Sequence, residues 1–145
     1  MTAILTLENC QLTDTVTVNP DALKGIPATY TTAALQPNEQ LTVDQLLHVL
    51  LIPSANDAAN VLAYHVAGSI ENFAIMMNAK AKEIGCRNTH FVNPSGVHND
   101  DHYSTAYDMA LIGKFANTFD TVKDIVTQTQ YSLPDLPDGK KRNFK

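Results

Sequence analysis

The chain has 145 residues, which fits a single domain with a real hydrophobic core, and its formal net charge is −5. This acidic balance argues against a nucleic-acid partner, because nucleic acids attract basic surfaces. No apolar stretch reaches membrane-spanning length, and residues 1–8 carry no basic residue of the kind that opens a signal peptide. The two cysteines, Cys10 and Cys86, are too few and too isolated to form a metal motif, and they indicate nothing about redox compartment.

The first third of the chain predicts a helix, a strand and a loop. Residues 1–8 are rich in helix formers but have no start signal, so they predict the end of a helix that Asn9 closes. Residues 13–18 (TDTVTV) alternate polar and apolar side chains and predict a short half-buried strand. Residues 25–37 are small and polar, which is typical of a loop with short extended pieces.

Two apolar helices meet at a proline in the middle of the chain. Residues 42–45 (TVDQ) form a capping-box pattern that predicts the start of the first helix. We expect Ile52 to leave helical geometry because it precedes Pro53, and a proline has no backbone donor to continue a helix. The next helix is rich in alanine, ends at Gly68 and is predicted to be the buried central helix.

The remaining elements follow from caps and breakers. Ser69 is predicted to cap a third helix and Ser104 a fourth, and residues 120–127 predict a shorter helix. Residues 130–145 contain three Pro or Gly breakers and are predicted to form an irregular tail. Residues 1–145 as a whole predict one helix-rich partial domain.

Several stretches resemble one enzyme family. Ser54-Ala55-Asn56 is similar to the S-x-N motif of the serine penicillin-recognising enzymes, which also carry S-x-x-K and K-T-G. More closely, the chain resembles the D-alanyl-D-alanine carboxypeptidases of low molecular mass, peptidase family S11. The similarity runs from residue 1 to about residue 129 and is carried by residues 35–42 (LQPNEQLT), 54–59 (SANDAA), 88–96 (NTHFVNPSG) and 102–110 (HYSTAYDMA).

The chain departs from this family in two motifs. It contains neither Ser-x-x-Lys nor Lys-Thr-Gly, and residues 1–5 (MTAIL) resemble the run that follows the catalytic lysine in the family. The resemblance therefore implies a mainly α structure: the helical lobe of the α+β β-lactamase/transpeptidase-like fold, with one or two short strands and most of the sheet lobe missing. Apolar surface exposed where that lobe would dock predicts a homodimer.

The resemblance also implies a function for the parent protein. It would be a serine-type D-Ala-D-Ala carboxypeptidase, a penicillin-binding hydrolase that trims peptidoglycan stem peptides through an acyl-enzyme, without a cofactor, outside the bacterial cytoplasmic membrane. Ser54 would relay a proton between the lysine and the leaving amine. Asn56 would contact the lysine and the substrate's peptide carbonyl. Without the nucleophile and its lysine, the chain alone is expected to be catalytically incompetent.

Other interpretations of these residues stay open at this point. Ser54 also suits the N-cap of a helix, Asp57 suits its first turn, and Asn60 is interpreted as structural. Ser95 either lines the substrate cleft or belongs to a plain turn. As alternatives, the chain is a class A β-lactamase relative or a non-catalytic remnant that binds cell-wall peptide.

The histidines do not predict a metal site. His98 and His102 stand four apart, a spacing that can bind zinc on a helix. Their segment reads as a loop and lacks the glutamate of H-E-x-x-H, so no metal is predicted. His48 and His65 fall in predicted helices, where they are interpreted as satisfied or surface residues.

Overall fold

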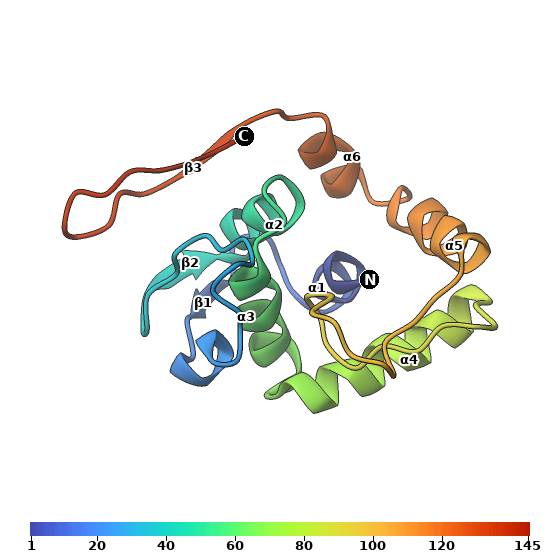
Figure 1. Cartoon of the computed structure of the whole chain (residues 1–145). Coiled ribbons are helices and arrows are strands. Elements are labelled where there is room, and N and C mark those ends of the chain that lie inside the picture. Colours follow the sequence, from blue (N-terminus) through green and yellow to red (C-terminus); the bar gives the residue numbers. More distant parts are fainter.

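The computed structural model describes residues 1–145 and consists mainly of helices with two small sheets. In chain order its elements are α1 (Thr2–Asn9), β1 (Thr15–Thr17), the 3-10 helix η1 (Pro20–Leu23), β2 (Gln40–Thr42), α2 (Val43–Leu51), α3 (Asn56–Ala67), α4 (Ile70–Ile84), α5 (Ala106–Ala116), α6 (Asp120–Val126), β3 (Tyr131–Leu133) and β4 (Arg142–Phe144). Helix α3 lies at the centre and contacts α1, α2, α4 and β1 (Figure 1). No helix combines the length and hydropathy that a membrane crossing requires.

Most predicted helix ends are confirmed, and each has a local cause. Thr42 and Gln45 form the predicted capping box: each side chain accepts a hydrogen bond from the other's backbone N–H, at 3.1 and 2.9 Å. Helix α3 ends at Gly68, whose φ of 77° lies in the left-handed region that glycine adopts without steric cost. Ser69 then caps α4 by accepting from the Asn72 N–H at 3.1 Å.

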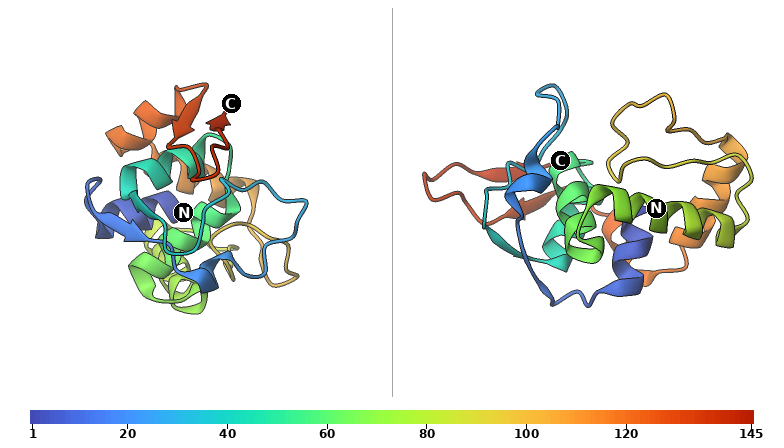
Figure 2. Two further views of the ribbon diagram at one scale, coloured as in Figure 1. Left: turned by 90° about the vertical axis from the view of Figure 1, so that its left-hand side faces the viewer. Right: turned by 90° about the horizontal axis from the view of Figure 1, so that it is seen from below.

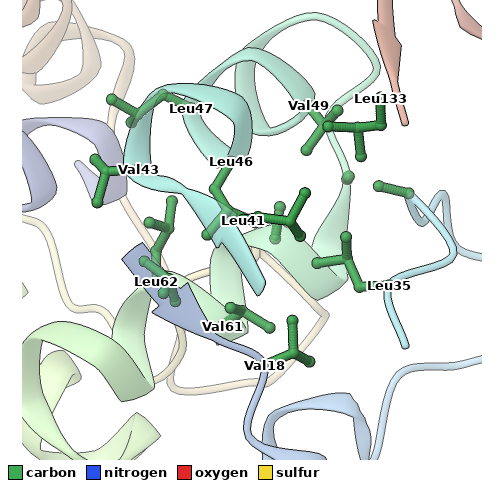
Figure 3. Close-up of a cluster of buried hydrophobic side chains, with 14 of the residues drawn as sticks. Val18, Leu35, Leu41, Val43, Leu46, Leu47, Val49, Val61, Leu62 and Leu133 are labelled. Carbon is green, nitrogen blue, oxygen red and sulfur yellow. The ribbon is translucent and has the colours of Figure 1, made fainter. Parts of the chain in front are cut away.

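The main core lies between α2, α3 and the β1–β2 sheet. The two strands pair antiparallel with Val16 opposite Leu41, and both side chains point into the core, where Leu46 and Leu62 are fully buried (Figure 3). A smaller apolar cluster joins α1, α3 and α4 through Leu5, Ala63, Phe73 and Met77. Alanine on α3 lets neighbouring helices approach closely, so the prediction of a buried central helix is confirmed.

The tail differs from the sequence prediction. Residues 130–145 form an antiparallel hairpin in which Tyr131 pairs with Phe144, so this segment is not irregular. The chain thus has four short strands in two sheets where one or two were expected. Strands of three residues show too little alternation to be recognised, and the Pro and Gly residues between them build the turn of the hairpin.

The start of α5 corrects a second prediction. Thr105, not Ser104, is the N-cap, and its hydroxyl accepts from the Asp108 N–H at 3.1 Å. The Ser104 hydroxyl instead lies 2.9 Å from the Thr89 hydroxyl. Two adjacent hydroxyl residues offer equivalent caps, and the tertiary contacts of Asp108 select the second one.

Buried Asp108 fastens α5 to the segment that follows α4. One of its carboxylate oxygens accepts from the backbone N–H groups of Arg87 (3.1 Å) and Asn88 (2.7 Å) and from the Thr89 hydroxyl (2.7 Å). These donors, the Thr89 hydroxyl above all, lower the pKa of the Asp108 carboxyl below its ordinary value. The charged form of Asp108 therefore stabilises the fold.

Large apolar side chains remain exposed on two outer helices. Ile75 on α4 and Tyr107 and Met109 on α5 keep 68%, 70% and 53% of their accessible surface. Association of two copies through such a surface stays a prediction.

The hairpin is anchored by a buried ion pair. The Arg142 guanidinium, with a side chain only 3% exposed, donates to both Glu39 carboxylate oxygens at 2.6 and 3.1 Å. It also donates to the Pro134 carbonyl oxygen at 2.6 and 2.8 Å. This bidentate geometry is the strong form of an arginine–carboxylate pair, and it joins residues 103 positions apart.

Replacing Asp108 tests its role in acid stability. The folded pKa of Asp108 lies below the unfolded value of about 3.9. The charged carboxylate therefore contributes fully to the free energy of unfolding above the unfolded pKa, and this contribution is lost as the pH falls through the folded pKa. We expect Asp108→Asn to lower the free energy of unfolding at pH 7 and to lose less stability between pH 7 and pH 3 than the parent chain. Urea unfolding at the two pH values measures both. Parallel acid dependence in the two proteins would contradict the assignment, and Asp100→Asn is the exposed control.

Removing the Arg142 side chain tests the anchor of the hairpin. We expect Arg142→Ala to lower the free energy of unfolding by about 3 kcal/mol, because Glu39 then keeps a poorly solvated charge without its partner. The neighbouring Lys141, whose side chain is 72% exposed in its pair with Asp135, is the matched control. Lys141→Ala should cost less than about 0.5 kcal/mol. Equal midpoints for the two variants in urea would show that the pair does not hold the hairpin.

Candidate active site

The turn between α2 and α3 carries the S-x-N residues. Ile52 keeps right-handed helical dihedrals (φ −83°, ψ −66°), so the prediction that it leaves helical geometry is wrong. Helix α2 nevertheless ends at Leu51, because Pro53 has no N–H with which to continue the ladder. The Ala55 N–H reaches back across the turn to the Val49 carbonyl oxygen at 3.0 Å and closes it.

Ser54 has the strained backbone of this turn. Its φ of 60° lies in the left-handed region, which costs a residue with a side chain about 1–2 kcal/mol. The N-cap of α3 is Ala55, so Ser54 does not cap the helix as one interpretation proposed. Its side chain is exposed, and its hydroxyl has no hydrogen-bond partner within the chain. Strain of this kind persists only where the surroundings enforce it, and it occurs preferentially at functional sites.

Asn56 is buried and held by the loop before β2. Its side-chain Nδ2 donates to the Thr31 carbonyl oxygen at 3.0 Å, and its backbone N–H donates to the same oxygen at 2.9 Å. One amide hydrogen and the Oδ1 atom remain uncommitted within the chain. Asn56 can therefore still accept one hydrogen bond and donate another in a fixed orientation.

Asp57 fixes the loop that holds Asn56. Its carboxylate, 3% exposed, accepts from the backbone N–H groups of Ala33 (2.9 and 3.1 Å), Leu35 (3.1 Å) and Ala58 (2.9 Å). Burial raises the pKa of Asp57, and these backbone donors oppose that shift. Asp57 therefore acts as a structural clamp, beyond the first-turn acid that the sequence indicated. Asn60, also on α3, donates to the Ala22 carbonyl oxygen at 3.1 Å, which fits its structural interpretation.

Ser95 lies in a loop that contacts the first turn of α1. Asn93 shapes this loop: its Oδ1 accepts from the Gly96 N–H at 2.7 Å, and the Ser95 hydroxyl lies 3.5 Å from the same atom. The Thr2 hydroxyl donates to the Pro94 carbonyl oxygen at 2.7 Å. No hydrogen bond joins Ser95 to Ser54 or Asn56, so its place in a substrate cleft stays a prediction.

These segments share one face of the molecule. The loop before β2 and the loop before α5 both project from it, and the N-terminal end of α1 faces the same side (Figure 2). The Asn56–Thr31 and Thr2–Pro94 hydrogen bonds attach the two loops to α3 and α1. The loop before β2, which is attached to Asn56 next to the strained turn, therefore projects from the same face as the N-terminal end of α1.

Three of the histidines either contact neighbouring residues or are largely exposed. The His102 Nδ1 atom accepts from the Val92 N–H at 3.0 Å, and burial lowers its pKa, with a smaller effect of His90. His98 is 83% exposed and lies 3.4 Å from Asp100. His48 stacks on Tyr131 with ring centroids 4.2 Å apart.

Sequence reasoning missed the residues that position the site. Thr31 acts through its backbone carbonyl oxygen, and Thr2 acts through its hydroxyl. Both lie in segments without a motif, so no local pattern in the sequence identifies them. The turn around Ser95 was expected from the sequence, and Asn-Pro-x-Gly is a pattern in which the asparagine side chain bonds the backbone ahead of it, as Asn93 does.

Replacing Asp57 tests the clamp. Asp57→Asn keeps the shape but turns one accepting oxygen into a donor that faces backbone N–H groups. We expect it to lower the free energy of unfolding by about 2 kcal/mol and to speed hydrogen exchange at the Ala33 and Leu35 amides. Unchanged exchange at those two amides would exclude the clamp. Asp100→Asn, whose side chain is fully exposed, should leave both measurements unaltered.

Comparisons with known proteins agree on one family. The sequence profile of the D-alanyl-D-alanine carboxypeptidases, Peptidase S11, matches residues 1–134. The D-alanyl-D-alanine carboxypeptidase DacF of Bacillus subtilis is 43% identical over 106 residues, covering 73% of this chain and 27% of the relative. DacC of Escherichia coli is 42% identical over 113 residues, covering 76% of this chain and 28% of the relative.

Solved structures agree in fold. The D-alanyl-D-alanine carboxypeptidase of Mycobacterium tuberculosis H37Rv superposes with a TM-score of 0.86 at 28% identity, over 98% of this chain and 52% of that one. The Streptomyces K15 DD-transpeptidase gives a TM-score of 0.85 at 30% identity, over 99% of this chain and 59% of that one.

The chain thus spans about a quarter of these curated relatives and little more than half of the solved chains. The expected mainly α part of a larger catalytic fold is confirmed. From the match over residues 1–134, the chain belongs to the D-alanyl-D-alanine carboxypeptidase family, peptidase family S11.

Proposed function

We propose that these residues form the S-x-N wall of the active site of a serine-type D-Ala-D-Ala carboxypeptidase. The observation that carries the proposal is the exposed Ser54 hydroxyl on a strained left-handed backbone, directly before the buried and oriented Asn56. A plain helix start would place its serine at the N-cap, where it would accept from the backbone of the first turn. Here that hydroxyl is left free.

Ser54 would act as a proton relay. In this family's chemistry the serine of S-x-x-K attacks the carbonyl carbon of the terminal D-Ala-D-Ala bond, and its proton passes to the neighbouring lysine. The Ser54 hydroxyl would take a proton from that lysine while giving its own to the departing D-Ala amine. A hydroxyl can donate and accept at once, and its lack of an internal partner leaves both functions available.

Asn56 would orient the lysine and the substrate. Its uncommitted Oδ1 would accept from the lysine ammonium, and its second amide hydrogen would donate to a peptide carbonyl of the stem peptide. The two bonds to Thr31 set the plane of this amide before substrate arrives. Such preorganisation reduces the entropy cost of placing reactants.

This function also implies the substrate of the protein and the compartment in which it acts. The substrate would be a peptidoglycan stem peptide that ends in D-Ala-D-Ala, and β-lactams would acylate the same nucleophile. Work on the cell wall would place the protein outside the bacterial cytoplasmic membrane. Residues 1–5, which resemble the run that follows the catalytic lysine in the family, form the end of α1 that faces the two loops (Figure 2). Ser95, on the loop that Thr2 contacts, would border the bound peptide.

Covalent labelling by a fluorescent penicillin tests this function. The 145 residues alone should show no label after denaturing electrophoresis, because they contain no Ser-x-x-Lys. Placed in the Bacillus subtilis relative in exchange for its matching segment, they should give a protein that is labelled. In that hybrid, Ser54→Ala should slow acylation by roughly 10²-fold or more, the usual size of a lost acid–base catalyst.

The exposed Ser132 of the hairpin provides the control, since Ser132→Ala should leave the acylation rate unchanged. Circular dichroism establishes that each hybrid is folded. A folded Ser54→Ala hybrid that is acylated as fast as its parent would overturn the relay, and stable labelling of the 145 residues alone would overturn their incompetence.

A further inference from the structure

A second cluster of reactive side chains lies away from the S-x-N turn. The Cys10 thiol, a carboxylate oxygen of Asp14 and a ring nitrogen of His65 all lie within 4.8 Å of one another. His65 stands nine residues after Asn56 on α3, which is about 14 Å along the helix axis. The cluster is therefore separate from the candidate active site.

Three packed elements bring these side chains together. Cys10 directly follows α1, Asp14 precedes β1, and His65 lies in the last turn of α3. Helix α3 packs against both α1 and β1 (Figure 1). Because these elements share one core, the spacing of the three side chains is set by the fold.

The Cys10–Asp14 loop is closed by hydrogen bonds of its own. The Cys10 N–H donates to the Thr6 carbonyl oxygen at 2.9 Å, and the Asp14 N–H donates to the Gln11 carbonyl oxygen at 3.1 Å. In return, the Gln11 N–H donates to Asp14 Oδ2 at 2.8 Å. That bond orients the carboxylate while leaving Oδ1 uncommitted, which is the supporting arrangement found behind metal ligands.

The ligand set selects one class of ion. Thiolate, imidazole and carboxylate together suit zinc, whereas magnesium and calcium take oxygen ligands. A cysteine thiolate and an aspartate carboxylate carry two negative charges, which balance Zn²⁺. A tetrahedral zinc site places its ligand atoms roughly 3.3–3.6 Å apart. Rotation of the exposed His65 side chain can narrow the remaining gap while the Gln11 hydrogen bond holds the Asp14 carboxylate.

We propose that Cys10, Asp14 and His65 bind a zinc ion, with a water molecule as the fourth ligand. Binding releases the thiol proton to solvent and links the end of α1 to the end of α3. The sequence predicted no metal site here because these three residues match no zinc spacing. Folding brings the three side chains together although their positions in the sequence form no motif.

Cobalt(II) is the probe, because it replaces zinc and reports its ligands by absorption. Titration of the purified, reduced chain should give one equivalent of bound Co²⁺ with a near-ultraviolet thiolate-to-cobalt band, and equimolar Zn²⁺ should displace it. Cys10→Ser should abolish that band. His65→Ala and Asp14→Asn should each weaken binding by about tenfold or more, because the loss of even a residue that supports a metal ligand has an effect of that size.

The chain offers matched controls for this test. Cys86→Ser removes the other half-buried thiol, and His98→Ala removes an exposed histidine; both should bind Co²⁺ like the parent. His65 is exposed, so His65→Ala keeps the test valid even if Cys10→Ser fails to fold. Absence of a thiolate band in the parent, or its persistence at full strength in folded Cys10→Ser or His65→Ala, would overturn the site.

Discussion

The buried carboxylate of Asp57 is the interaction on which the candidate site depends. It lies in the first turn of α3, and it gathers the backbone N–H groups of Ala33 and Leu35 from a loop more than 20 residues earlier in the chain. That loop presents the Thr31 carbonyl oxygen to Asn56. Without the carboxylate, two buried backbone donors would lack acceptors, and the loop that orients Asn56 would lose its attachment to the central helix.

The strained turn before α3 follows from the same packing. Apolar side chains of α2 and α3 share one core, so the chain must change direction in the few residues between them (Figure 3). Pro53 ends the first helix, and the Ala55–Val49 hydrogen bond fixes the width of the turn. Ser54 absorbs this change of direction with a left-handed backbone, and its side chain is exposed. Stability of the core thereby supports a conformation that an isolated turn would not keep.

Local sequence patterns predicted most helix ends correctly, but they did not predict features that depend on contacts between distant segments. The Thr42–Gln45 box, Gly68 and Ser69 were predicted correctly, because a cap involves residues within one helical turn. The choice of Thr105 over Ser104 and the β3–β4 hairpin were not predicted. The cap depends on the hydrogen bonds that Asp108 accepts from Arg87 and Asn88. The hairpin depends on the ion pair between Arg142 and Glu39.

The sequence by itself determined the helix-rich core, the position of the S-x-N motif and the family resemblance, since these are carried by neighbouring residues in a fixed order. Only the tertiary structure decided that Ser54 is strained and free, that Thr31 orients Asn56, and that Cys10, Asp14 and His65 meet. The physical reason is separation along the chain. Backbone carbonyl oxygens and side chains from distant segments carry no motif, and core packing alone brings them within bonding distance.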